Sequence, residues 1–559
     1  MHPGQFLRFP VLFSIELGAL AVALLTAWTA PALGEPWFRP LESALGRFAR
    51  RPVLSLVAVA LLPIFLRLLL LPVLPPPEPW VHDEFANLLG ADTFAHGRLT
   101  NPTHPMWMFF ETMHVLEQPT YASMYPPAQA GCLALGQVLT GMPWAGVILS
   151  MAVFSAVLLW MLRGWLPPGW ALLGAGLAIV RLGLFSYWMN SYWGGAPAAI
   201  GGALVAGAVP RIVKRRRWRE AVLLGIGLVL LANTRPFEGL MFSLPFGIYL
   251  LIRMLRRPAA FLPVAIPLAA VLAAGTAWLG YYNWRVTGDP AQFPELLHER
   301  LYSVAPNFVW GQRRPDPRYN HAVLREFYTS FEPTFADFHN PLKALTHKGL
   351  DAFTFFLGPL LAMPLVLAPR TLASGRIRLL VAAVLCEAIA LGCIEWSFRP
   401  HYAAPCTAAL YALVLQGARG VRLWKWRGLA SGRLLVRAIP VVALLMVAVR
   451  LSAASWGLRL QAWPPDWSVT TPSGAARAQV LERLHEIPDR FLLIVRYRPG
   501  HPTWNEWVYN EADIDNAQVV WARELPGGED PLIAYFRGRT VLVIEPDANP
   551  IAIHPYGAQ

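Results

Sequence analysis

Residues 52–85 read PVLSLVAVALLPIFLRLLLLPVLPPPEPWVHDEF, an apolar run followed by prolines and an acidic pair. About 20 apolar residues are enough for a helix to cross the hydrocarbon core of a membrane, so residues 52–74 predict a spanning helix. Proline cannot continue a helix, and Pro75 to Pro79 therefore lead the chain out along an extended path. The stretch places Asp83 and Glu84 just outside the membrane surface.

Similar apolar runs recur along the chain and decide the fold class. Of its 559 residues, 55% are hydrophobic and only 14% are charged, against about 25% charged in a typical soluble domain. The sequence therefore predicts an all-α polytopic membrane bundle of about 12 transmembrane helices. The expected spans are 10–29, 52–74, 144–162, 169–187, 195–212, 220–234, 237–253, 260–282, 351–368, 378–394, 402–417 and 437–454.

Lysine and arginine cluster in short gaps between these runs, and this distribution orients the bundle. Although the net charge is +13, clusters that flank apolar runs are typical of cytoplasmic loops rather than of nucleic-acid binding. All of them fall on one side, and the long segments 76–143 and 284–350 fall on the other side with the C-terminal tail. The clusters are Arg47 to Arg51, Arg163, Lys214 to Arg219, Arg253 to Arg257, Arg370 to Arg378 and Arg419 to Arg437.

One apolar stretch, residues 128–142, is predicted not to cross. A crossing there would move the Lys214–Arg219 cluster and every later one to the outside, so we expect a helix that lies in the outer interface. The same count leaves the N-terminus outside.

From about residue 456 the long apolar runs end, and shorter strand-like and helical segments follow. Phe491–Tyr497, Ala517–Glu524 and Thr540–Glu545 read as strands, and Arg477–Ile487 and Asp530–Arg537 read as helices. The expected organisation is a transmembrane domain over 1–455 and a small α/β domain over 456–559 on the outer face.

The acidic pair has two interpretations. Neighbouring carboxylates beside low-dielectric material, here Asp83 and Glu84, are where a general base or a metal ligand can be made. Alternatively, Asp83 caps the following helix. Farther along the same loop, Glu111 and His114 share a face if helical, and with His82 and Asp83 they form a candidate site for a divalent cation.

Candidate cations lie at the outer ends of later spans. Arg235, Arg399 and His401 can bind an anionic headgroup such as a lipid phosphate, since the arginine fork suits phosphate geometry. A mutual ion pair of Arg235 with Glu238 is the structural alternative. Tyr192 lies at the same depth and either lines the cavity or anchors the chain at the interface.

Several function classes are excluded. The chain has no P-loop and no Rossmann fingerprint, which disfavours ATP or NAD chemistry. No span carries a series of buried acids as an ion relay would. Four cysteines without a CxxC pair exclude a disulfide scaffold. The aromatic content of loop 284–350 favours an ordered cover over a cleft.

An acidic motif in the first outer loop (His82-Asp83-Glu84), a Pro-Pro element before an interfacial helix (Tyr125-Pro126-Pro127), many spans and a soluble outer domain occur together. This layout resembles the GT-C superfamily of polyprenyl-phosphate-sugar-dependent glycosyltransferases, in particular the protein mannosyltransferase and aminoarabinose transferase branch. Tyr125 stands where that family usually has lysine.

The resemblance implies an inverting glycosyltransferase, whose partners are a polyprenyl-phosphate-linked sugar, membrane lipid and a glycan, lipid or protein acceptor. Its residue usage, rich in Ala, Arg, Pro and Trp, and the absence of an Asn-x-Ser/Thr sequon favour the bacterial inner membrane. Asp83 would be the catalytic carboxylate, with Glu84 secondary. Arg235, Arg399 and His401 are the donor-phosphate candidates by location, and the acceptor or cavity candidates are His82, Glu111, His114, Tyr125 and Tyr192. No cofactor other than a divalent cation is expected. The alternative is a membrane protein that binds or flips a polyprenyl-linked lipid without catalysis.

Overall fold

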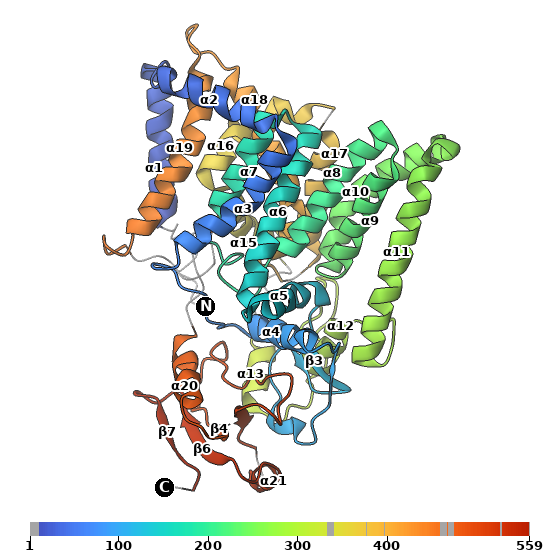
Figure 1. The fold of residues 1–559 in the computed structure, drawn as a ribbon, viewed down its shortest axis with the longest axis vertical. Coiled ribbons are helices and arrows are strands. Elements are labelled where there is room, and N and C mark those ends of the chain that lie inside the picture. Colours follow the sequence, from blue (N-terminus) through green and yellow to red (C-terminus); the bar gives the residue numbers. More distant parts are fainter. Residues whose placement is uncertain are drawn as a thin grey trace.

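The structure, a computed structural model, describes residues 11–332, 340–375, 377–395, 397–458, 467, 474–525 and 528–557. A bundle of long helices forms one part and a small sheet region forms the other (Figure 1). The bundle comprises α1 (Val11–Thr29), α3 (Pro52–Leu69), α6 (Pro143–Trp165), α7 (Pro168–Leu182), α8 (Ala196–Arg215), α9 (Trp218–Ala232), α10 (Pro236–Arg256), α11 (Pro258–Thr287), α15 (Pro341–Ala352), α16 (Gly358–Leu367), α17 (Arg378–Ile389), α18 (Thr407–Arg422) and α19 (Ser431–Ser452).

Eight helices of the described residues are long and apolar enough to cross a membrane: Val11–Thr29, Pro52–Leu69, Pro143–Trp165, Ala196–Arg215, Pro236–Arg256, Pro258–Thr287, Leu342–Leu367 and Ser431–Ser452. The other four predicted spans coincide with α7, α9, α17 and α18, which have 16 residues or fewer. Sixteen residues rise only about 24 Å, short of the roughly 30 Å hydrocarbon core. The number of about 12 spans therefore stays a prediction.

Proline marks where many of these helices begin. It occupies the first position of α3, α6, α7, α10 and α11. Its missing N–H costs nothing in the first turn, and its fixed φ suits a helix, so proline ends one segment and starts the next.

Small residues bring the central helices close together. A Cβ added at Gly202 of α8 would overlap the carbonyl oxygen of Pro405, and one at Gly227 of α9 would press on Leu204. Close backbone approach of this kind is how helices pack where no water drives their association.

Basic side chains gather at one end of the bundle, which we call the basic end. The amphipathic helix α2 (Glu35–Ala49), which the sequence analysis did not predict, lies there (Figure 1). Glu42 of α2 pairs with Arg422 and Arg437, and Arg163 donates to the carbonyl oxygen of Ala49. Segments far apart in sequence thus bring their positive charge to the same end.

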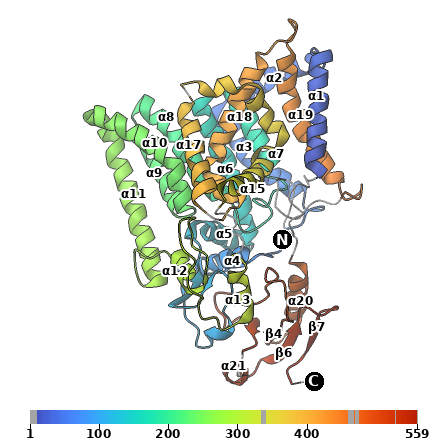
Figure 2. The ribbon, with the colours of Figure 1, turned by 180° about the vertical axis from the view of Figure 1, so that it is seen from behind.

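The opposite end carries the short elements. Helices α4 (His82–Ala95) and α5 (Pro127–Thr140) lie beyond the ends of the long helices, between the bundle and the C-terminal sheet (Figure 1). Residues 127–140 form a helix, as predicted for 128–142. Its place in the outer membrane interface stays a prediction. The first loop also holds η2 (Trp107–Phe109) and a three-stranded antiparallel sheet of order β1 (Asn101–Pro102), β3 (Thr120–Ser123), β2 (Val115–Leu116). Figure 2 shows α12 (Pro294–Tyr302) and α13 (Ala322–Thr329) at the same end.

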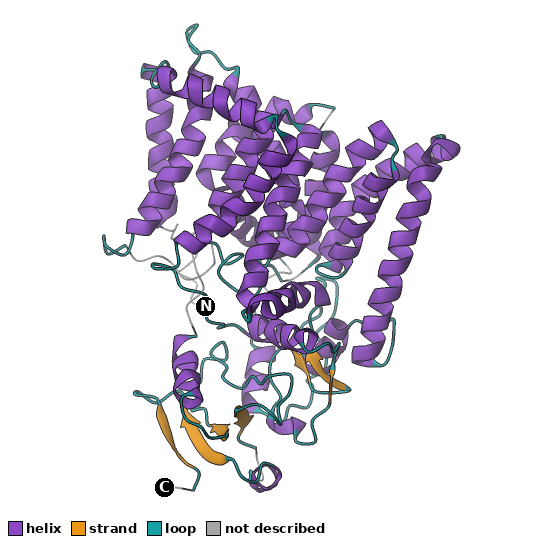
Figure 3. Ribbon diagram, in the orientation of Figure 1, coloured by secondary structure: helices purple, strands orange, loops and turns teal. Residues whose placement is uncertain are grey.

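The C-terminal unit, residues 474–557, contains the predicted α/β elements. They are α20 (Ala475–His485), β4 (Phe491–Val495), β5 (Val519–Arg523), α21 (Asp530–Tyr535) and β6 (Thr540–Glu545), with β7 (Ala552–Pro555) added. The sheet order is β5-β4-β6-β7, where β4 is parallel to β5 and β6, and β7 is antiparallel to β6. Figure 3 shows the strands gathered away from the long helices. The unit packs on α4, because Tyr509 stacks on Phe85 with ring centroids 4.2 Å apart.

Candidate active site

The two carboxylates of the acidic motif do different things. Helix α4 begins at His82, and Glu84 caps it: Oε2 accepts the N–H groups of Trp80 and Val81 at 2.9 and 3.1 Å. Oε1 accepts the N–H of Tyr192 at 3.0 Å. Burial raises the pKa of Glu84 to about 7, although these N–H donors oppose the shift. Glu84 does not line a cavity in the described structure.

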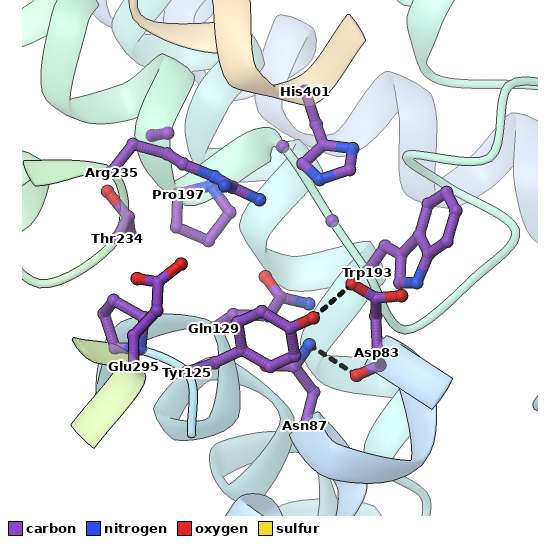
Figure 4. A pocket seen from close by; sticks show the side chains of 14 residues that line it. Asp83, Asn87, Tyr125, Gln129, Trp193, Pro197, Thr234, Arg235, Glu295 and His401 are labelled. Atoms are coloured by element: carbon purple, nitrogen blue, oxygen red, sulfur yellow. Dashed lines mark hydrogen bonds between the residues drawn. The ribbon is translucent and has the colours of Figure 1, made fainter. Parts of the chain in front are cut away.

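Asp83 is therefore not the capping residue, and that interpretation of the motif is wrong. Its side chain is 25% exposed and lines a cavity, and the Tyr125 hydroxyl donates a hydrogen bond to Oδ1 (Figure 4). His114 completes the arrangement, with Nδ1 2.5 Å from the Tyr125 oxygen and 3.7 Å from Asp83 Oδ1. Because the hydroxyl gives its single proton to Asp83, His114 donates to Tyr125 through Nδ1–H.

His114 is held in an uncommon backbone conformation. Its φ is +64°, a region that histidine enters more readily than most residues but at a cost in energy. Its N–H donates to the Tyr328 hydroxyl at 3.3 Å. Burial lowers the pKa of His114, although Asp83 opposes the shift, and burial with the Asp83 charge raises the pKa of Tyr125. Both groups are thus neutral partners of the carboxylate near pH 7.

The cavity has a volume of about 760 Å³ and lies where the bundle meets the short elements. Arg235, Arg399 and His401 line it from the bundle side, and Asp83 and Tyr125 line it from the first loop. A recess of about 50 Å³ is lined by four of these residues, without Arg399, and in Figure 4 Arg235 and His401 lie across from Asp83 and Tyr125. Residues predicted from four separate stretches of sequence are therefore brought together.

Each cation has a neighbour that orients it. The guanidinium of Arg235 lies 4.1 Å over the ring of Tyr402, and its Nη1 is 3.7 Å from Glu238 Oε1. The expected ion pair thus exists, but at a length that leaves the guanidinium facing the cavity. Arg399 Nη1 donates to the carbonyl oxygen of Phe398 at 2.9 Å.

His401 is fixed by Tyr187. The Tyr187 oxygen accepts the backbone N–H of His401 at 2.9 Å and lies 3.0 Å from its Nδ1. The Tyr187 proton therefore points to Nδ1, and the neutral ring carries its own proton on Nε2. His401 can donate that hydrogen bond to an anion.

The remaining predicted residues lie away from the cavity. His82 is fully buried, with Nδ1 2.9 Å from the Tyr509 hydroxyl. Glu111 accepts hydrogen bonds from the Tyr302 hydroxyl at 2.9 Å and from Asn320 Nδ2 at 2.7 Å. The Tyr192 hydroxyl donates to the carbonyl oxygen of Pro77 at 3.0 Å. Each polar group is held by a structural partner.

This placement fits a divalent cation poorly. Asp83 and His114 share Tyr125 as a partner, whereas His82 and Glu111 have other partners. The part of the chain that the structure describes contains no group of three or more His, Cys, Asp or Glu side chains that could hold a metal ion.

Part of the cavity wall was not predicted from the sequence. Glu295, His298 and Glu299 of α12 line the cavity. Burial raises the pKa of Glu295, and burial with the Glu295 charge raises that of Glu299 to about 7. Their spacing of i, i+3 and i+4 puts them on one helix face and could have identified them. Residues between 293 and 331 of the loop 284–350 line the cavity. Tyr402, Phe327, Phe331 and Trp504 also contribute, but no sequence signal joins them.

No protein-family model and no curated protein matches the sequence. Among solved structures, the chain is similar to ArnT from Cupriavidus metallidurans bound to undecaprenyl phosphate, with 14% identity, 88% of this chain and 92% of that chain covered, and a TM-score of 0.47. It is also similar to the oligosaccharyltransferase of Archaeoglobus fulgidus tethered with an acceptor peptide, with 12% identity, coverage of 88% and 68%, and a TM-score of 0.48.

A third solved structure is AglB from the same archaeon in complex with an inhibitory peptide and a dolichol-phosphate, at 11% identity, coverage of 88% and 69%, and a TM-score of 0.41. All three likenesses have TM-scores below 0.5. The function and the residue roles proposed below are therefore argued from the cavity of this chain.

Proposed function

We propose that this protein is an integral membrane glycosyltransferase that moves a sugar, with inversion, from a polyprenyl-phosphate donor to an acceptor. The observation that carries the proposal is the cavity that Asp83 lines together with Arg235, Arg399 and His401, with Arg235 and His401 across from Asp83 (Figure 4). One wall thus supplies a base and the other supplies donors for an anion.

The hydrogen-bond donors suit the leaving group. A polyprenyl phosphate departs as an anion, and preorganised donors at the place where negative charge develops lower the barrier. Arg235 and Arg399 offer planar forks and the neutral His401 offers one N–H donor. Arg235 precedes α10, and Arg399 and His401 precede α18, so the isoprenoid chain can stay in lipid while its phosphate reaches the cavity.

Asp83 suits the incoming group. Its carboxylate takes the proton of the acceptor, the acceptor atom forms a bond to the anomeric carbon, and the bond from that carbon to the phosphate oxygen breaks with its electron pair. Tyr125 engages Oδ1, so Oδ2 is the oxygen that receives the proton. One displacement of this kind inverts the configuration of the sugar.

The charge distribution supports an orientation. Cytoplasmic loops carry the excess of lysine and arginine, which assigns the basic end to the cytoplasm. The cavity and the C-terminal unit then lie on the outer face of a bacterial plasma membrane. The division into a transmembrane domain over 1–455 and an outer domain over 456–559 is part of the same proposal.

Comparison of envelope glycans tests the function. We expect mass spectrometry to show a sugar modification in cells that carry the wild-type gene, and to show its loss both on deletion and on complementation with Asp83→Asn. A protein that only binds or flips the lipid needs no carboxylate at this position, so full complementation by Asp83→Asn would favour that alternative.

A further inference from the structure

Trp504 enters the cavity from the C-terminal unit. It lies between β4 and β5, lines the cavity together with Pro502, and is 38% exposed. All other lining residues come from the bundle or from its two long loops. The C-terminal unit therefore supplies part of the wall.

Three aromatic rings hold the indole of Trp504. It stacks on His82 with centroids 5.8 Å apart and an interplanar angle of 22°. Phe327 and Phe331 of the second long loop meet it at steep angles, at 5.4 and 6.1 Å. Burial, and then the nearby His114, lowers the pKa of His82 to about 3, so its ring is an uncharged support. The result is a rigid aromatic surface at the side of the cavity.

A buried ion pair lies inside the C-terminal unit, and two hydrogen bonds connect this unit to the first loop and to α4. Arg523 Nη2 and Glu506 Oε2 are 2.8 Å apart, with both side chains almost fully buried. Arg523 Nε also donates to the carbonyl oxygen of Glu111 at 2.5 Å, and the N–H of Ala512 donates to Asp92 of α4 at 2.9 Å. The unit that carries Trp504 is thus tied to the helix that carries Asp83.

Geometry indicates which substrate meets Trp504. In an in-line displacement the leaving phosphate and the incoming atom lie on opposite sides of the anomeric carbon. The cations come from the bundle, whereas Trp504 comes from the sheet unit at the far end of the molecule (Figures 1 and 2). The phosphate of the donor lipid occupies the bundle side of the cavity, where its hydrogen-bond donors lie. The acceptor therefore enters from the opposite side, past Trp504.

We propose that Trp504, backed by Phe327 and Phe331, is a platform that binds a pyranose ring of the acceptor, and that the acceptor is a saccharide. The inference rests on the proposed transferase function. The C–H face of a pyranose packs on an aromatic ring, while its hydroxyls need polar partners. Glu295 and Glu299, which line the same cavity as Trp504, supply such polar partners.

Saturation-transfer NMR on the full chain in lipid nanodiscs tests this proposal. The probes are free disaccharides of glucose and of N-acetylglucosamine, with a short Ser/Thr peptide as the comparison. We expect Trp504→Ala to weaken disaccharide binding about tenfold and Trp504→Phe to retain most of it, because a phenyl ring still offers a stacking face. Trp284→Ala, at a 51% exposed position that does not line the cavity, is the matched control and leaves binding unchanged.

The same variants are assayed for sugar transfer together with Asp83→Asn, which separates the two proposals. Unchanged disaccharide binding in Trp504→Ala, binding of the peptide alone, or no disaccharide binding to the wild type would each overturn the saccharide platform. If the saccharide platform is overturned but Asp83→Asn still loses transfer, the transferase proposal stands without the platform. Weakened binding in Trp504→Ala with full transfer in Asp83→Asn would support the platform and reject the carboxylate mechanism.

Discussion

Asp83 and Glu84 are adjacent in the sequence but have opposite environments. Glu84 is fully buried and satisfies three backbone N–H groups, whereas Asp83 opens to the cavity. Two adjacent residues on the first turn of α4 thus point in different directions: Glu84 is structural, and Asp83 is the candidate base. The sequence alone could propose both as catalytic, because it does not specify which way each side chain points.

Glu84→Gln should reduce stability and not catalysis. An amide has one acceptor oxygen, so the N–H groups on one side of Glu84 lose their partner at a cost of about 1–3 kcal/mol. We expect a lower thermal unfolding midpoint but a normal transfer rate per folded molecule. A loss of transfer at normal stability would contradict the capping role.

Stability should also depend on pH through Glu84. Its folded pKa of about 7 exceeds the unfolded value, so the folded state binds the proton more tightly. The stabilisation is fully present below about pH 4.5, falls by about 3 kcal/mol as the pH rises to 7, and is constant above that. Denaturation of wild type and Glu84→Gln across this window measures it, and parallel profiles of the two proteins would show that another group is responsible.

Tyr125→Phe should slow catalysis because it removes the hydrogen bond that orients Asp83. Loss of a bond to a charged group predicts a fall of about 10- to 100-fold in kcat, with little change in donor binding. Tyr192→Phe is the matched control, since it removes a hydroxyl that bonds to Pro77 outside the cavity. Equal kcat in Tyr125→Phe and the wild type would remove Tyr125 from the mechanism.

At the scale of elements, apolar length and charge position predicted most of the architecture. The helix α5 was predicted to stay outside the bundle because of basic residues much later in the chain. The helix α2 was missed because Pro36, Pro40 and its charged residues hide an amphipathic pattern. Trp504 could not be predicted, because its place in the cavity depends on how the C-terminal sheet packs against α4.

Inside the C-terminal unit, Arg523 both pairs with Glu506 and donates to the carbonyl oxygen of Glu111 in the first loop. Although burial opposes ionisation, Arg523 and Tyr497 hold the pKa of Glu506 below its usual value. Glu506→Gln leaves a buried arginine without its counter-ion, and we expect a loss of about 3 kcal/mol, together with weaker disaccharide binding at Trp504.

The matched control lies in the same sheet unit. Glu524 pairs with Arg496 at 2.8 Å, but both side chains are 43% exposed. Solvent screens such a pair, so Glu524→Gln should cost less than about 1 kcal/mol. Thermal unfolding of both variants compares them, and equal losses would show that the buried pair does not hold the unit in place.

At the scale of the whole molecule, the two ends differ in charge and in content. Basic residues and α2 lie at one end, and the cavity, α4, α5 and the sheet lie at the other (Figure 1). In the proposed orientation the site lies at the end away from the cytoplasm, which suits a donor lipid whose sugar faces outward.

Cysteine labelling in intact cells tests this orientation. In a background without the four native cysteines, an impermeant maleimide should label Arg483→Cys on α20 and should not label Arg217→Cys between α8 and α9, both at exposed positions. Labelling of Arg217→Cys from outside would reverse the orientation.

The central claim is that the carboxylate of Asp83 performs sugar transfer, and single-turnover transfer by the purified protein in nanodiscs tests it most directly. The assay supplies a polyprenyl-phosphate sugar and an acceptor, and measures the glycosylated acceptor together with release of the free lipid phosphate. Asp83→Asn keeps an oxygen that accepts the Tyr125 hydroxyl, so folding and donor binding should persist while transfer falls by at least about a thousandfold. Transfer at the wild-type rate in Asp83→Asn would contradict the account.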